Sequence, residues 1–83
     1  MTDEEIIMRG VQADRICSDP VYQAAWEAVM KDLFNAWSTS PLEDVAGRER
    51  LRLELDVLNR LKGKFAGYMN EAELSKHYSA NAQ

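Results

Sequence analysis

The longest stretch of helical periodicity in this chain lies between residues 41 and about 69. At 100° per residue, its apolar side chains cover roughly 200° of the helix circumference. A helix that packs on a single neighbour needs an apolar stripe only somewhat wider than about 100°. This segment is therefore expected to bury two sides, one against its own chain and one against a further surface. The arc consists of Leu51, Leu53, Leu55, Val57, Leu58, Leu61, Phe65, Tyr68 and Met69.

Two shorter helices are predicted upstream by their N-terminal caps. Thr2 and Glu5 have the spacing of a capping box, which predicts a helix over about residues 3–17. Asp19 before Pro20 supplies an N-cap and a proline at the first helical position, which predicts a second helix over about 20–37. The apolar side chains of this second helix recur at intervals of three and four residues, as on one face of an amphipathic helix.

The long helix has a start signal of the same kind. Ser40, Pro41 and Glu43 combine a capping box with a proline at the first helical position, so the third helix is expected over about 41–69. Only residues 38–40 then separate the second and third helices. A link this short predicts that the two helices form an antiparallel hairpin. The fold class expected is therefore all-α.

The expected helix lengths indicate association. At 1.5 Å per residue the second helix spans about 27 Å and the third about 43 Å, so about 16 Å of the third helix extends beyond the hairpin. Those turns carry Leu61 and Phe65. The N-terminal helix offers only a thin stripe of small residues to cover them, interrupted by Gly10, which costs up to about 1 kcal/mol relative to alanine inside a helix. We therefore expect a second copy of the chain to cover them in an oligomeric bundle, most simply a two-fold dimer.

These arguments divide the apolar positions into two groups. The expected core within one chain is Tyr22, Trp26, Val29, Leu33, Trp37, Leu51, Leu55 and Leu58. The expected oligomer or partner interface is Leu53, Glu54, Val57, Leu61, Phe65 and Tyr68. Glu54 lies inside the apolar arc, where it could pair with Arg50 one turn earlier or with a basic side chain of a partner.

Length limits the chain to one domain, expected over residues 1–78 with a disordered tail over 79–83 that has nothing to bury. Below about 80 residues a monomer usually needs disulfides, a metal or association for stability. The single cysteine, Cys17, cannot form an internal disulfide and is expected to be a small buried hydrophobe. With no leader and no apolar run of about 20 residues, the chain is expected to be cytoplasmic and not in a membrane.

The charge pattern disfavours nucleic acid as a partner. The net charge is −4; residues 1–46 carry nine acidic and three basic side chains, and residues 47–83 carry five acidic and seven basic. Six of the basic side chains are scattered around the third helix and make no single phosphate-tracking stripe. Trp26 and Trp37 could stack on bases, but their positions on the apolar face favour the core.

No constellation for catalysis or metal binding is evident. General acid-base or nucleophilic chemistry needs converging groups, and none are spaced to converge here. His77, near the C-terminus, is expected to be a solvated surface histidine. The chain is therefore expected to be neither an enzyme nor a holder of a cofactor or metal.

Several segments resemble small all-helical accessory proteins encoded by tailed bacteriophages and prophages. The resemblance covers most of residues 9–75 and is carried by RGVQAD at 9–14, the Asp19 to Trp26 start, AWSTSP at 36–41, GRERLRL at 47–53 and LNRLK at 58–62. It implies a virus-encoded protein from the region of the structural and DNA-packaging genes, usually without an assigned activity. It supplies no catalytic residues.

Three functions are consistent with these expectations. The first is an oligomeric helical interaction module in virion assembly or DNA packaging, which binds a phage structural or packaging protein in the cytoplasm of a bacterial host. The second is a small viral inhibitor or adaptor that binds a host protein through its acidic N-terminal half. The third, a DNA-binding packaging subunit, is weakened by the acidic balance and by the lack of a helix-turn-helix spacing.

Overall fold

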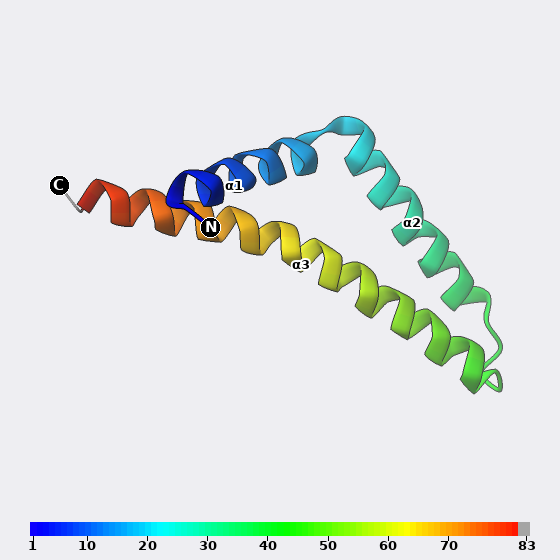
Figure 1. Cartoon of the computed structure of the whole chain (residues 1–83). Helices are drawn as coiled ribbons and strands as arrows, with labels where there is room; N and C mark the ends of the chain where they lie inside the picture. Colours follow the sequence, from blue (N-terminus) through cyan, green and yellow to red (C-terminus); the bar gives the residue numbers. More distant parts are fainter. Residues whose placement is uncertain (82–83) are drawn as a thin grey trace.

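The computed structural model describes residues 1–81, which form three helices and no strand: α1 (Asp3–Ser18), α2 (Pro20–Thr39) and α3 (Val45–Asn81) (Figure 1). The chain is therefore all-helical over this range. It is elongated, with extents of 62 × 24 × 17 Å and a radius of gyration of 17.9 Å. A compact domain of this length has a radius of gyration of about 12 Å.

The caps of α1 and α2 confirm the predicted starts of both helices. The Thr2 hydroxyl accepts a hydrogen bond from the Glu5 backbone N–H at 3.1 Å, and the Thr2 N–H donates to the Glu5 carboxylate at 3.2 Å. The Asp19 carboxylate accepts from the N–H groups of Val21 and Tyr22 at 2.8 and 3.1 Å. Each cap satisfies backbone donors that have no partner within the helix.

The predicted start of the third helix is wrong by four residues. The Ser40 hydroxyl donates to the Trp37 carbonyl oxygen at 2.6 Å, so it closes the end of α2 and does not cap α3. Residues 40–44 form the connection, and the Asp44 carboxylate accepts from the Gly47 N–H at 3.0 Å in the capping position. Because α2 continues to Thr39, the Ser40 side chain lies within reach of its last carbonyls.

The predicted end of the third helix, near residue 69, is also wrong, because α3 continues to Asn81. The sequence after Met69 contains no proline or glycine that would end a helix. The disordered tail expected over residues 79–83 stays a prediction. The helix α3 is described as far as Asn81, and residues 82–83 lie outside the described residues. The first of the extra turns pack beside α1, and the last extend past its N-terminal end (Figure 1).

The packing of α1 on the C-terminal half of α3 corrects the expectation that α1 is a poor cover. Gly10, Ala13 and Ala72 are buried where the two helices meet. A Cβ atom at Gly10 would lie only 2.2 Å from the Ala72 Cβ and 2.9 Å from the Tyr68 carbonyl oxygen. The small residues therefore permit a close approach of the two backbones, and the glycine that weakens α1 in isolation is what lets it pack on α3.

In contrast, two aromatic side chains of α2 make contacts with α3, one near each end of α2. At the start of α2, the ring of Tyr22 packs edge-on against Phe65, with centroids 5.8 Å apart. At its end, the Arg48 guanidinium lies 4.1 Å from the ring centroid of Trp37. The two helices are closest at their connection and diverge toward the start of α2, so the three helices outline an open triangle (Figure 1).

Candidate interaction surface

Several apolar grooves lie between α2 and α3, and Leu33 lines two of them. Around α3, Leu55 lies roughly 40° and Arg52 roughly 100° from Leu51, whereas Leu53 and Val57 lie roughly 200° and 240° from it. These two grooves therefore lie on opposite sides of the pair of helices. We name them the Phe34 groove and the Leu53 groove.

The Phe34 groove has a volume of about 350 Å³ and a wall that is almost entirely apolar. Phe34 stands at its edge with 69% of its surface exposed. The expected core and interface omitted this residue, although its aromatic side chain follows Met30 by one helical turn. The groove is lined by Met30, Leu33, Phe34, Trp37, Leu51, Arg52 and Leu55.

The Leu53 groove has a larger volume, about 490 Å³, and its lining includes one basic and one acidic side chain among apolar ones. Leu53 is 50% exposed and Val57 is 61% exposed. Within the part of the chain that the structure describes, no element covers these side chains, so a further surface would be needed to desolvate them. The groove is lined by Val29, Leu33, Arg50, Leu53, Glu54, Val57 and Leu58.

The residues expected in the core do not form a closed core. Six of them are half-buried: Tyr22, Trp26, Leu33, Leu51, Leu55 and Leu58. Val29 and Trp37 are exposed. Among the described residues, the only buried hydrophobic side chains are those of Ala13 and Ala72, and no large side chain is fully buried. The apolar faces of α2 and α3 are thus oriented toward each other without being removed from water.

The residues expected at an interface fall into two groups in the structure. Leu53, Glu54, Val57 and Leu61 are exposed on α3. The other two lie instead against their own chain. Phe65 packs on Tyr22, and the ring of Tyr68 lies 4.2 Å below the Arg9 guanidinium, which also pairs with Glu71 at 2.6 Å. Sequence reasoning omitted Arg9 because its partners are about 60 residues away along the chain.

Arg50 and Glu54 do not form the intrachain pair that their i,i+4 spacing allows. Among residues 1–81, neither side chain takes part in an ion pair or a hydrogen bond. Both nevertheless line the Leu53 groove. Of the two alternatives that the sequence leaves open for Glu54, the structure therefore does not contain the pair with Arg50.

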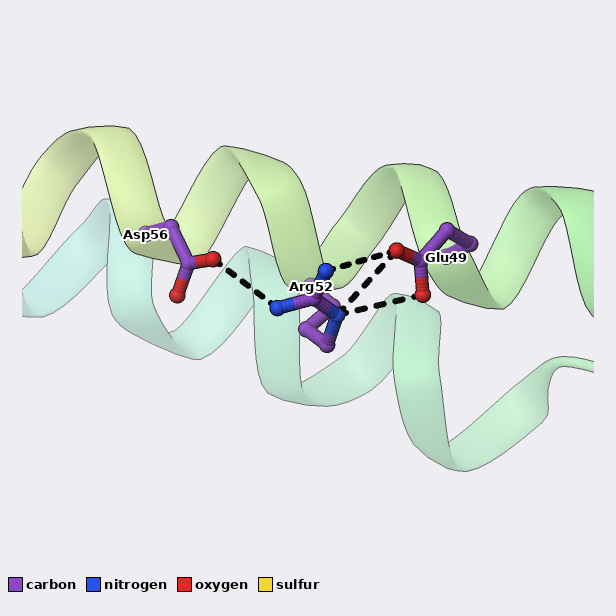
Figure 2. Close-up of polar contacts among 3 residues, drawn as sticks. All are labelled: Glu49, Arg52 and Asp56. Carbon is purple, nitrogen blue, oxygen red and sulfur yellow. Dashed lines mark hydrogen bonds and ion pairs between the residues drawn. The ribbon is translucent and has the colours of Figure 1, made fainter.

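The neighbouring charges on α3 are paired within the chain. Arg52 lies between Glu49 and Asp56 and bonds to both, with its shortest contacts at 2.6 and 2.9 Å (Figure 2). The hydrogen bond from Arg52 lowers the pKa of Glu49 below its ordinary value, and the same bond raises the pKa of Arg52. Arg48 donates to the carbonyl oxygen and the hydroxyl of Ser40 at 3.3 and 3.2 Å. Arg48 thus lies where α2 and α3 are connected, and Arg52 lies at the edge of the Phe34 groove.

The described part of the chain contains no group of three or more side chains able to hold a metal ion. Within the same residues, no helix combines the length and apolar character needed to cross a bilayer. The surface chemistry is thus that of apolar grooves with isolated charges at their edges. Comparisons with protein-family models, with curated proteins and with solved structures find no match to this chain.

Proposed function

We propose that this chain is a self-associating helical protein-protein interaction module. One observation carries the proposal: large apolar side chains line two open grooves between α2 and α3, while the hydrophobic residues buried in the described chain are two alanines. Exposed apolar patches of this kind mark protein-protein contacts.

The surface area supports the same proposal. The chain exposes 6540 Å². A compact monomer of its 9.5 kDa mass exposes about 5000 Å², which leaves an excess of roughly 1500 Å². A standard protein interface removes about 800 Å² from each partner, and obligate dimers remove about 1000 Å² or more. One obligate interface would therefore bring the exposed area close to that of an ordinary globular protein. In the proposed assembly, α2 and α3 act as a helical hairpin that packs on its copy in an oligomeric bundle.

The cellular role that we propose is that of a phage or prophage accessory protein in virion assembly or DNA packaging. The resemblance of residues 9–75 to small phage proteins supports this role, and two separate grooves support a bifunctional arrangement. One groove would hold a second copy, and the other would hold a segment of a capsid, portal or packaging protein. The Phe34 groove suits the second task because Met30 is adaptable and Phe34 is a rigid aromatic anchor.

The test is a binding assay between the purified chain and the purified structural and packaging proteins encoded beside its gene. We expect one of them to bind the wild-type chain, and Phe34→Asp to weaken binding at least about tenfold, because a charge in an apolar contact is left unpaired. Lys31→Glu, an exposed change on the same helix, serves as the matched control. Failure of every such protein to bind, or equal binding by Phe34→Asp, would contradict the proposed role.

A further inference from the structure

We propose that the Leu53 groove is a two-fold interface between two copies of this chain, in which Arg50 of each copy pairs with Glu54 of the other. This inference rests on the self-association proposed above and specifies its location. Two observations carry it: an unpaired arginine and an unpaired glutamate line one groove, and Val29, Leu53 and Val57 of the same groove are exposed.

The charges in this groove are self-complementary. In a two-fold interface the same patch of both copies meets, so that if residue i contacts residue j, then j also contacts i. Arg50 and Glu54 lie one helical turn apart on one side of α3, at roughly 260° and 300° relative to Leu51. Two α3 helices that cross in opposite directions near position 52 bring each Arg50 next to the other copy's Glu54. The contact forms two identical ion pairs and leaves no charge unpaired.

The apolar side chains fit the same arrangement. Leu53 and Val57 lie beside the two charged residues on one side of α3, and Val29 of α2 lines the same groove, so all three would be covered in this arrangement. These three side chains are each at least 40% exposed in the single chain. Their burial supplies the stabilisation, at about 25 cal/mol per Å² of apolar surface, and the charges fix the register.

Other occupants fit the groove less well. A phosphate backbone or an anionic lipid surface would be repelled by Glu54 and by the net charge of −4. An unrelated protein would need its own acidic and basic groups at matching positions, whereas a second copy supplies them by symmetry. The second copy is therefore the occupant that the charges of the groove select.

The experiment uses charge reversal and mixing. Sedimentation equilibrium gives the dimer dissociation constant of wild type, Arg50→Glu, Glu54→Arg and an equimolar mixture of the two variants. Each variant alone brings like charges together twice, so its dissociation constant should rise at least about tenfold. In the mixture, both contacts join opposite charges again, and the dissociation constant should return to within about threefold of wild type. An intrachain pair could not be restored by mixing. Lys31→Glu and Glu43→Arg, alone and mixed, are the matched controls and should leave the constant unchanged.

The outcomes separate this inference from the proposed function. Weaker dimerisation of each single variant, with recovery in the mixture, supports the interface. If dimerisation and folding are coupled, the helicity measured by circular dichroism falls in each variant and recovers in the mixture. A wild-type dimer whose dissociation constant is unchanged in both variants, or is not restored on mixing, overturns the interface and leaves self-association standing. A wild-type chain that is monomeric at every concentration overturns both.

Discussion

Gly10 sets the distance between α1 and α3. Its missing side chain lets Ala72 and the backbone of Tyr68 approach closer than any Cβ atom would allow. Gly63, on the same protein, has no such neighbour within 4 Å of the position that a Cβ would take. The two helical glycines therefore differ in packing while sharing the same intrinsic helix propensity.

Gly10→Ala should accordingly destabilise the protein, whereas Gly63→Ala should stabilise it by up to about 1 kcal/mol. Alanine gains the same helix propensity at both positions, so the difference between the variants isolates the clash with Ala72. Overpacking of this kind costs about 1–3 kcal/mol. Chemical denaturation followed by circular dichroism measures both free energies of unfolding. Equal stabilisation by the two substitutions would contradict the close packing of α1 on α3.

The ion pairs of Arg52 predict a pH dependence. Because the pKa of Glu49 is lowered in the folded chain, its contribution to stability is present above the ordinary carboxyl value, about 4.3, and is lost as the pH falls through the lower folded value. Arg52→Gln removes this contribution. The melting temperature of the variant should therefore lie slightly below that of wild type at pH 7, and the difference should shrink at pH 3. A difference that stays constant between the two pH values would refute this account.

At the scale of the helices, Arg48 at the start of α3 contacts residues at the end of α2. Its guanidinium covers the Trp37 ring and bonds to Ser40, so one side chain fixes both helices and the connection between them. Lysine keeps the charge but has neither the planar stacking surface nor the forked donors of arginine. A lysine at position 48 could therefore not make the same contacts with Trp37 and Ser40.

Arg48→Lys should therefore lower the free energy of unfolding by about 1 kcal/mol. Arg60→Lys is the control, because Arg60 is exposed on the same helix and makes no ion pair or hydrogen bond among the described residues. Denaturant titration followed by tryptophan fluorescence measures the free energy of unfolding of both variants, and Trp37 itself reports on its contact with Arg48. Indistinguishable unfolding curves for the two variants would show that the contact with Trp37 does not hold α2.

Local signals predict much of the helical structure. The capping residues at Thr2 and Asp19 determine the starts of α1 and α2, because each acts within three residues of its own position. The start of α3 is mispredicted because Ser40 can cap one helix or close the previous one, and only the end of α2 decides between them. The close packing at Gly10 depends on Ala72, some 60 residues away, which a periodic pattern does not reveal.

The candidate interaction surface, too, could be predicted from the sequence only in part. Helical periodicity identifies Leu53, Val57 and Leu61 as apolar positions beyond what one neighbour needs, and all three are exposed. The same periodicity cannot distinguish them from Phe65 and Tyr68, which α1 and α2 cover within the chain. To make that distinction one must know where α1 packs on α3, and this position is set by the small residues at which the two helices meet.

For the whole molecule, the balance of charge predicts weak interaction with nucleic acid. Arg48 and Arg52 are engaged within the chain, and the net charge is −4. We expect no strong binding of labelled duplex DNA near physiological salt in a fluorescence-anisotropy titration. Submicromolar binding at about 50 mM salt that falls about 10³-fold by 200 mM, and that Arg48→Ala with Arg52→Ala abolishes, would place the DNA-packaging role first.

The proposed assembly follows from the shape of the whole chain. An elongated molecule with open grooves and two buried alanines leaves more apolar surface in water than a stable monomer of this size normally does. In the proposed dimer, a second copy would cover part of that surface by symmetry, without any further component. Stability and self-association should therefore be linked, so that the melting temperature rises with protein concentration.

Sedimentation equilibrium of the purified chain over roughly 1–100 µM tests self-association most directly. We predict a mass twice that of the chain at the upper concentrations, and a shift to the monomer for Leu53→Asp, which places an unpaired charge in the Leu53 groove. Glu43→Arg, exposed in the connection between α2 and α3, should retain the wild-type mass. A single monomeric species at every concentration, with a cooperative thermal transition that does not depend on concentration, would contradict the account.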